Sequence, residues 1–278
     1  MNAPLPPKLV ALGLAAWPFP KAPDPRALFR FPALEELLAR LGFACGLHGI
    51  ALLTGDPGSG KSTALRLFLA GRDERTQPVV YLADSRLTPA EFYARVLDHF
   101  GVAVGLTRSQ RRRQFQTLMA DLQDGQAKDV TVIIDEAHEL TPEMVQELRY
   151  VQNLHLDAQS PCTLILCGQS EIRAQLRLRS FEAVAQRITV RAHLPGFARE
   201  ETAAFVGHAL RHAGVDRTLF TEGALDALHS QSRGLMRPIA LLATHALVDA
   251  ALLDQQLVDE PNVQRAIQDI VEGGPAHV

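Results

Sequence analysis

The sequence contains few cysteines, few aromatic side chains and no long hydrophobic run. Its three cysteines, Cys45, Cys162 and Cys167, show no CxxC or Cys/His spacing, which argues against a zinc site and predicts reduced core residues. No stretch reaches the ~18 apolar residues that a membrane helix needs, so we expect no membrane insertion. The formal net charge of −3 excludes a polybasic coat, so any binding of nucleic acid would require a local basic patch.

The composition indicates a globular protein with two unequal domains. The 278 residues are 47% apolar and 21% charged, close to the averages of ordered domains. Residues 1–25 are rich in proline and predict an extended N-terminal arm. Short apolar runs alternate with helical patterns over residues 26–195, and residues 196–278 contain helical patterns only. We therefore expect an α/β domain followed by a small all-α domain.

Five short apolar runs, each followed or preceded by a helical pattern, predict the strands of the α/β domain. They lie at residues 49–55, 78–84, 129–135, 162–168 and 187–194. Thr88 and Pro89 are typical of an N-cap and a first helical position, so a helix should begin there. Strands that alternate with helices predict a parallel sheet covered on both faces, which is a three-layer α/β/α domain.

Residues 55–62, GDPGSGKS, match the phosphate-binding pattern G-x-x-x-x-G-K-[ST] between a predicted strand and a predicted helix. Backbone N–H groups of such a loop hold the phosphates of ATP, Lys61 would reach the β and γ phosphates, and Ser62 would coordinate Mg²⁺. The residues expected to bind the nucleotide are Gly55, Asp56, Pro57, Gly58, Ser59, Gly60, Lys61, Ser62 and Thr63.

A second motif follows the predicted strand VTVII, where the chain continues with Asp135 and Glu136. Asp135 would hold the magnesium ion or its water shell, and Glu136 would orient and deprotonate the attacking water. These residues predict an ATPase. The letters DEAH also name a group of helicases, but two tandem motor domains would not fit into 278 residues. His138 could contact a neighbour, or it could be a satisfied or solvated side chain.

The expected location is the cytoplasm. Lys8 and the apolar residues after it are faintly similar to a secretion signal, but the remainder of the sequence predicts a site that needs ATP.

Six segments together resemble the AAA+ ATPases of the ExeA type. They are PFPKAPDPRALF, LLTGDPGSGKST, VTVIIDEAHELTPEMVQELR, LILCGQSEIRAQL, VAQRITVRAHL and SRGLMRPIALL. The resemblance extends from about residue 16 to about residue 270. The wider group includes the TnsC and TniB transposition regulators and lies near the Cdc6/Orc-like initiators. The resemblance implies a P-loop AAA+ domain followed by a helical lid.

The resemblance also implies roles for three further residues. Gln169 matches sensor 1, Arg187 matches the arginine finger that serves the neighbouring subunit, and Arg237 matches sensor 2 on the lid. Gln169 could instead be a plain loop residue and Arg237 a surface residue of a helix. Other candidates for the arginine finger are Arg177, Arg179 and Arg191.

The adenine pocket is expected at Pro238 and the WPFP segment at residues 17–20. Alternatively, Trp17 and Phe19 simply anchor the arm to the core.

Within this group we expect a regulator of DNA transposition. ExeA proteins of secretion pathways continue into a membrane span and a cell-wall-binding region, and this sequence ends at residue 278, which favours the transposon-associated branch. The expected contacts to DNA phosphates are Arg108, Arg111, Arg112 and Arg113, where TnsC-like proteins face the duplex. The alternative is a solvated helix face.

The expected partners follow from this hypothesis. They are double-stranded DNA bound without sequence preference, a transposase, a target-selection protein, and further copies of the chain in a ring or helical filament. Two alternatives stay open. One is a secretion-pathway ATPase that works with a separate membrane partner, and the other is a nucleotide-switch scaffold for proteins.

Overall fold

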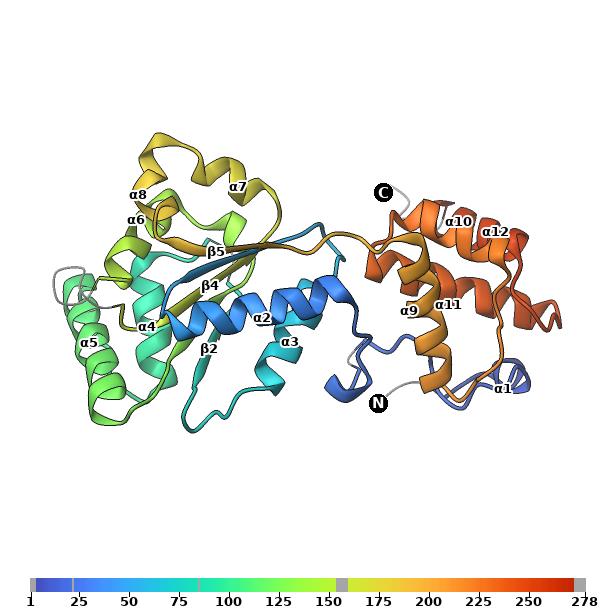
Figure 1. The fold of residues 1–278 in the computed structure, drawn as a ribbon, viewed down its shortest axis with the longest axis horizontal. Coiled ribbons are helices and arrows are strands. Elements are labelled where there is room, and N and C mark those ends of the chain that lie inside the picture. The colour runs from blue at the N-terminus through green and yellow to red at the C-terminus, as the bar shows by residue number, and fades with distance from the viewer. Residues whose placement is uncertain (1–3, 22, 85, 154–159, 273–278) are drawn as a thin grey trace. The chain divides into compact units, whose positions relative to one another are not determined.

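The computed structural model describes residues 4–21, 23–84, 86–153 and 160–272. Two compact units share the chain, and Figure 1 shows both. The α/β unit consists of Pro32–Asp56 and Lys61–Leu194. The helical unit consists of Met1–Phe31, Pro57–Gly60 and Pro195–Val278.

Five parallel strands form the sheet of the α/β unit, in the order β2-β3-β4-β1-β5. Their bounds are β1 Ile50–Thr54, β2 Val79–Leu82, β3 Thr131–Ile134, β4 Thr163–Gly168 and β5 Ile188–His193. All residues of β1, β3 and β4 are buried, as expected for central strands of a parallel sheet. Strand β5 lies at an edge and alternates buried and exposed residues. The predicted parallel sheet is therefore confirmed.

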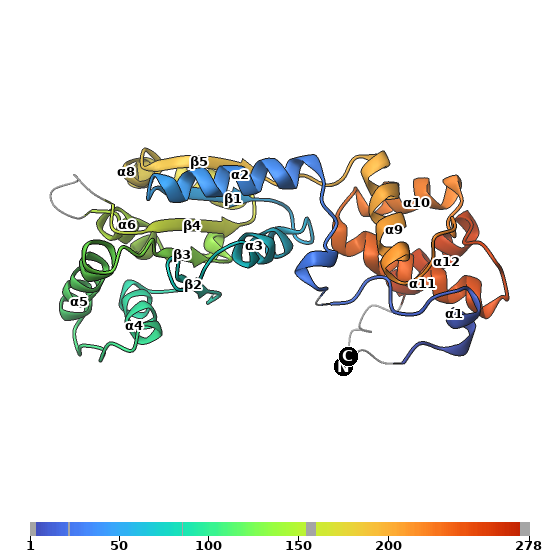
Figure 2. The same cartoon turned by 60° about the horizontal axis from the view of Figure 1, so that its bottom comes forward.

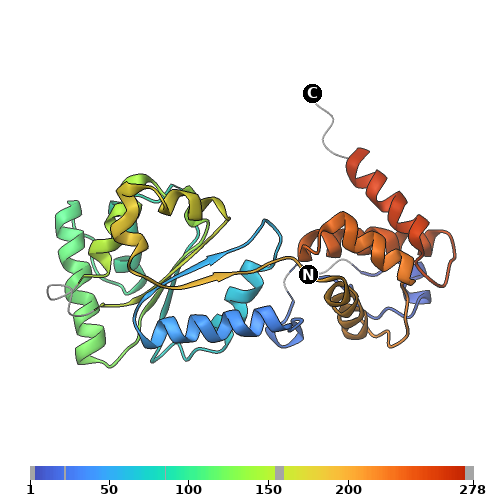
Figure 3. The ribbon, with the colours of Figure 1, turned by 45° about the horizontal axis from the view of Figure 1, so that its top comes forward.

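Helices cover both faces of this sheet. On one face lie α2 (Pro32–Gly46) and α3 (Lys61–Ala70), which pack against each other. The opposite face is covered by α4 (Pro89–His99), α6 (Pro142–Val151), α7 (Glu171–Leu176) and α8 (Glu182–Ala185). In Figure 3 the blue helix α2 lies below the strands, and the yellow helices α7 and α8 lie above them. This is the predicted α/β/α arrangement.

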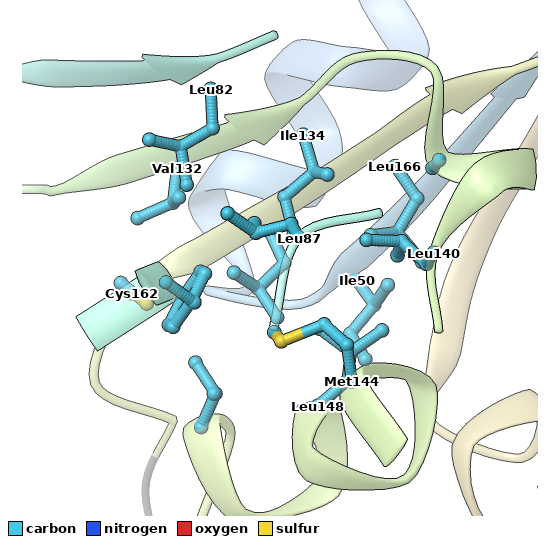
Figure 4. Close-up of a cluster of buried hydrophobic side chains, with 14 of the residues drawn as sticks. Ile50, Leu82, Leu87, Val132, Ile134, Leu140, Met144, Leu148, Cys162 and Leu166 are labelled. Atoms are coloured by element: carbon cyan, nitrogen blue, oxygen red, sulfur yellow. The ribbon is translucent and has the colours of Figure 1, made fainter. Parts of the chain in front are cut away.

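The core between the sheet and α6 is built from buried hydrophobic side chains. Ile50, Val132 and Ile134 point from the sheet toward Met144 and Leu148 of α6 (Figure 4). All five are fully buried. Burial of such side chains contributes about 1.5–3 kcal/mol each, which fixes the strands beneath the helices.

Helix α5 (Arg108–Ala120) packs against α4, and Figure 2 shows the two together. Thr107 caps α5 in a reciprocal box with Gln110, as Thr88 caps α4 with Glu91. The helix start expected at Thr88 and Pro89 is thus confirmed. A π-helical turn, Asp121–Gly125, continues α5, and 3₁₀ turns occupy Ala137–Glu139 (η3) and Arg179–Phe181 (η4).

The helical unit contains four long helices, which pack on one another. They are α9 (Arg199–His212), α10 (Glu222–Ser232), α11 (Met236–Leu252) and α12 (Glu260–Glu272). Apolar side chains of α11 such as Ile239, Leu242 and Ala246 are buried among them. In the described part of the chain, no helix combines the length and the hydrophobicity that a membrane span requires.

The N-terminal segment belongs to this helical unit, and the prediction that it is extended is wrong over Pro7–Ala11. These residues form helix α1, which begins with a proline at its first position, where a missing N–H costs nothing. Leu9 is buried, and the N–H of Ala15 donates to the carbonyl oxygen of Ala213 at 2.7 Å. A 3₁₀ turn, Pro25–Ala27 (η1), follows.

Aromatic rings join the N-terminal segment to α9 and to Phe197, which precedes it. Phe31 packs edge-on against Phe197, with centroids 4.8 Å apart, and Phe19 lies 5.7 Å from Phe205. Edge-on and tilted pairs of this kind stabilise packing by about 0.5–1.5 kcal/mol beyond area burial. Phe19 therefore anchors the segment to the helical unit, and a contact of Phe19 with adenine stays a prediction.

Candidate active site

Three loops leave the sheet of the α/β unit at the same edge. β4 pairs in parallel with both β1 and β3, so the three strands end side by side. The phosphate loop follows β1, Asp135 follows β3, and Gln169 follows β4. Ligands of open parallel sheets bind at the carboxyl ends of the strands. The topology therefore places predicted site residues from distant parts of the sequence at one edge.

The phosphate loop turns at two glycines with positive φ. Gly58 has φ +84° and Gly60 has φ +103°, values that cost a side-chain-bearing residue free energy. Helix α3 begins immediately afterwards, at Lys61. Because the first N–H groups of a helix have no partner within it, the end of the loop offers free donors and a partial positive charge.

The side chain of Lys61 lies along the loop that precedes it. Its Nζ donates to the carbonyl oxygens of Gly55, at 2.8 Å, and Asp56, at 3.1 Å. The residue is 9% exposed, and among the described residues no acidic side chain forms an ion pair with it. A buried cation held only by carbonyl dipoles is stabilised when an anion binds beside it.

Ser59 supplies a second sign that the loop is built for a ligand. Its Oγ is buried and has no hydrogen-bond partner in the described part of the chain. A hydroxyl in that position costs about 1–3 kcal/mol unless a partner arrives. Within the α/β unit, the buried Lys61 and the free N–H groups of α3 fit the phosphates of a nucleotide.

Asp135 is held in place by two donors. Its Oδ1 accepts the N–H of Glu136 at 2.9 Å, and its Oδ2 accepts the hydroxyl of Tyr81 on the neighbouring strand β2. Asp135 is 8% exposed. Burial, followed by the bond to Asp135, raises the pKa of Tyr81 well above its usual value, so this hydroxyl remains a donor. Apart from its place in a predicted strand, no sequence feature marked Tyr81 as a residue of the site.

Glu136 adopts an unusual backbone conformation. Its φ of 51° and ψ of 37° lie in the left-handed region, which residues other than glycine adopt uncommonly. The side chain is 50% exposed, and its Oε2 lies 3.4 Å from Nδ1 of His138. The expected base therefore projects from a strained turn next to a histidine.

Gln169 contacts the other side of the same histidine. Its side-chain Nε2 lies 3.0 Å from Nε2 of His138, and its backbone N–H donates to Nδ1 of His138 at 3.4 Å. Glu136, His138 and Gln169 thus form one contact chain. His138 is a satisfied histidine, one of the alternatives left open by the sequence, and its two partners come from the motifs after β3 and β4.

Arg187 lies at the amino ends of the parallel strands, opposite the carboxyl ends where the site loops begin. It stands directly before β5, whereas the site loops follow the carboxyl ends of strands parallel to β5. Six strand residues separate the two edges by roughly 20 Å. Its Nη1 donates to the carbonyl oxygen of Ala183 at 2.9 Å. Among the competing arginines, Arg177 and Arg179 are exposed, and Arg191 donates to Ala185.

Arg237 and Pro238 lie against the phosphate-loop residue Gly58 within the helical unit. The N–H of Arg237 donates to the carbonyl oxygen of Gly58 at 3.0 Å. A Cβ on Gly58 would lie 3.1 Å from Cβ of Arg237 and 3.2 Å from Cδ of Pro238. The first turn of α11 therefore requires glycine at this position of the loop. The side chain of Arg237 is exposed, and its role as sensor 2 stays a prediction.

Three of the four arginines expected to contact DNA are bonded within the α/β unit. Arg108 forms ion pairs with Glu143 and Glu147 of α6. Arg111 donates to the carbonyl oxygens of Gly105, at 2.7 Å, and Ala90, at 3.0 Å.

Arg112 lies over the ring of Tyr150, 4.2 Å from its centroid, and Arg113 is exposed. Arg113 makes no hydrogen bond or ion pair among the described residues. Contact of these four arginines with DNA stays a prediction.

The sequence did not reveal the carboxylate that organises these arginines. Glu147 is 1% exposed, and its Oε1 accepts the hydroxyl of Tyr93 at 2.7 Å, while Oε2 accepts Arg108 at 2.5 Å. Glu147 links α4, α5 and α6. The only sequence feature that could have indicated a buried role for Glu147 is its place, as a charged residue, at an apolar position of the predicted helix.

These features define a P-loop AAA+ fold, and comparison with known proteins agrees. Residues 46–176 match the family model described as an AAA domain. The chain is 33% identical over 245 residues to general secretion pathway protein A of Aeromonas hydrophila, which covers 86% of this chain. The chain spans 44% of the length of that relative.

Solved structures with the same fold come from several sources. Cdc6p from Pyrobaculum aerophilum has a TM-score of 0.69 at 15% identity, covering 91% of this chain and 70% of its own. The Aeropyrum pernix ORC1 protein in complex with DNA has a TM-score of 0.64 at 17% identity, covering 91% of this chain and 69% of its own. The Thermotoga maritima RuvB Holliday junction branch migration motor has a TM-score of 0.59 at 16% identity, covering 91% of this chain and 73% of its own. At these identities the likeness concerns the fold alone.

Proposed function

We propose that the chain is a magnesium-dependent ATPase of the ExeA type within the AAA+ proteins. The observation that carries this proposal is the meeting of Asp135, Glu136 and Gln169 at the sheet edge where the phosphate loop begins. Lys61, the free N–H groups of α3 and the hydroxyl of Ser59 would bind the phosphates. Ser62 and Asp135 would hold Mg²⁺, which when bound offsets phosphate charge.

Glu136 and Gln169 supply the groups for hydrolysis. The side chain of Glu136 is half exposed, so its carboxylate is accessible to a water molecule. A carboxylate in this place accepts the proton that the attacking water loses. The amide of Gln169 orients that water.

Arg187 is proposed to act on a neighbouring copy of the chain. Its position at the opposite edge of the sheet separates it from the site of its own subunit. An arginine supplied in trans stabilises charge on the transferred phosphoryl group and makes hydrolysis depend on assembly. We therefore propose a homo-oligomer, in a ring or a helical filament.

Two substitutions test the ATPase. Lys61→Ala should abolish binding of a fluorescent ATP analogue, because the buried cation beside the phosphates is lost. Glu136→Gln should bind the analogue with unchanged affinity and lose hydrolysis in a phosphate-release assay. Hydrolysis at the normal rate by Glu136→Gln would remove Glu136 from the role of base.

For the work that hydrolysis drives, we propose the regulation of DNA transposition. In this proposal the assembled protein binds duplex DNA through phosphate contacts and recruits a transposase. Exposed Arg113 supports it, because a free guanidinium suits a phosphate oxygen. The solved structure of a protein with this fold in complex with DNA is a second support.

A secretion-pathway ATPase is the second candidate. It is favoured by the 33% identity to general secretion pathway protein A over 86% of this chain. Such a protein would act with a membrane partner and would not require DNA.

Electron microscopy separates these two functions. The purified protein would be imaged with a non-hydrolysable ATP analogue, with and without double-stranded DNA, and Lys61→Ala would serve as control. Rings or filaments that form only with both ligands support the transposition regulator. Assembly that is independent of DNA supports the secretion ATPase.

A further inference from the structure

We propose that His138 is a positioning residue that couples Gln169 to Glu136. The proposal rests on the ATPase function and goes beyond it, because no role of the phosphate site requires a histidine here. The contact chain runs from Oε2 of Glu136 to Nδ1 of His138 at 3.4 Å, and from Nε2 of His138 to Nε2 of Gln169 at 3.0 Å.

The imidazole is fixed in place by its surroundings. Its side chain is 13% exposed and lies against Gly168, the last residue of β4. A Cβ on Gly168 would lie 3.1 Å from the backbone N of His138 and 3.2 Å from its Nδ1. Glycine at the end of β4 is what allows the ring to approach this closely. His138 is therefore wedged between the turn that bears the base and the strand that bears Gln169.

Glu136 and Gln169 share one ring nitrogen of His138. Nδ1 lies 3.4 Å from Oε2 of Glu136 and 3.4 Å from the backbone nitrogen of Gln169, which donates its N–H to Nδ1. A ring nitrogen that accepts this N–H cannot at the same time donate to the carboxylate. If Gln169 moves toward the nucleotide, Nδ1 loses the N–H that it accepts, and its contact with Glu136 changes with it. Occupancy of the γ-phosphate site is thereby transmitted to the base.

Glu136 depends on this contact for its orientation. Apart from His138, its carboxylate has no hydrogen bond or ion pair among the described residues, and the side chain is 50% exposed. A half-exposed carboxylate with one neighbour samples several rotamers when that neighbour is removed. Because misplacement of a catalytic group by 1 Å can lower a rate about 100-fold, loss of the imidazole should lower kcat.

The experiment measures kcat, KM for ATP and binding of a fluorescent ATP analogue for His138→Ala, Gln169→Ala and the double variant. We expect His138→Ala to lower kcat about tenfold or more, while nucleotide affinity changes less than about twofold. Because the two residues act in one chain, the double variant should be no slower than the slower single variant. Multiplicative losses in the double variant would overturn the coupling.

Matched variants separate positioning from folding. Glu139→Ala alters an exposed side chain of the same turn η3 and should keep the wild-type kcat. His138→Asn keeps an amide near the place of Nδ1 but has no counterpart of Nε2, the atom that contacts the side chain of Gln169. It should therefore restore part of kcat and stay insensitive to Gln169→Ala. If His138→Ala does not fold, His138→Asn provides the test in its place.

The outcomes of this proposal and of the ATPase assignment are distinct. Wild-type kcat in His138→Ala, together with no hydrolysis by Glu136→Gln, would overturn the role of His138 and leave the base in place. Normal hydrolysis by Glu136→Gln would overturn both. Equal loss of kcat in Glu139→Ala and His138→Ala would show that the turn is merely structural.

Discussion

The N–H of Arg237 donates to the carbonyl oxygen of Gly58, and the two residues lie so close that a Cβ on Gly58 would meet Cβ of Arg237 at 3.1 Å. Within the helical unit, Gly58 and the first turn of α11 are therefore fitted to each other. Gly58 is part of the phosphate-binding sequence motif, and its close contact with α11 is a second reason why this position requires glycine.

Gly58→Ala should weaken nucleotide binding and destabilise the protein. Its φ of +84° and the crowding by Arg237 and Pro238 together cost about 1–3 kcal/mol. Thermal unfolding and binding of a fluorescent ATP analogue would measure both effects. Gly42→Ala, in α2 with nothing within 4 Å of the added methyl group, is the control and should raise stability by about 0.5–1 kcal/mol. Equal behaviour of the two variants would contradict the close fit.

Arg187→Ala and Glu136→Gln should each abolish hydrolysis, and their mixture should regain part of it. In a mixed oligomer, some interfaces combine an intact Glu136 from one copy with an intact Arg187 from its neighbour. Steady-state phosphate release at varied mixing ratios would show the recovery. If Arg187 served the site of its own subunit, no ratio would recover activity.

Glu147→Ala should destabilise the α/β unit by about 2–4 kcal/mol. The substitution leaves the hydroxyl of Tyr93 and the guanidinium of Arg108 without their buried acceptor. Denaturant unfolding would measure the loss. Glu143→Ala removes the other partner of Arg108, but that carboxylate is 60% exposed, so the cost should stay below about 1 kcal/mol. Similar costs for both variants would contradict the importance of burial.

Arg113→Ala should weaken binding of duplex DNA without a loss of stability. Removal of one phosphate contact reduces the slope of log K against log salt by about 0.9. Fluorescence anisotropy at several salt concentrations would give this slope. Arg111→Ala, which removes two bonds to backbone carbonyls, should instead lower stability by about 1–3 kcal/mol. An unchanged slope for Arg113→Ala would remove this residue from the DNA surface.

Local signals were sufficient to predict the strands, most of the helices and the phosphate loop. Gly58, Gly60 and Lys61 follow an apolar strand at a fixed spacing, and that spacing alone defines the loop. The prediction of an extended N-terminal arm was wrong at Pro7–Ala11, because proline tolerates the first turn of a helix and Leu9 gains burial in it.

The basic cluster shows where local sequence was insufficient. Arg108, Arg111, Arg112 and Arg113 are nearly contiguous, yet the structure gives them different environments. Their neighbours Glu147 and Tyr150 lie more than 30 residues away along the chain. Whether an arginine is free for a ligand depends on such distant partners.

The sequence by itself determined the chemistry that the chain can carry, since lysine, carboxylates and glycines at short spacing specify a phosphate loop and the acidic motif after β3. Tertiary structure alone decided that His138 bridges Glu136 and Gln169, that Tyr81 holds Asp135, and that Arg187 stands at the far edge of the sheet. The physical reason is that these relations follow from the order of parallel strands, β2-β3-β4-β1-β5, which brings residues together across long separations that no local pattern encodes.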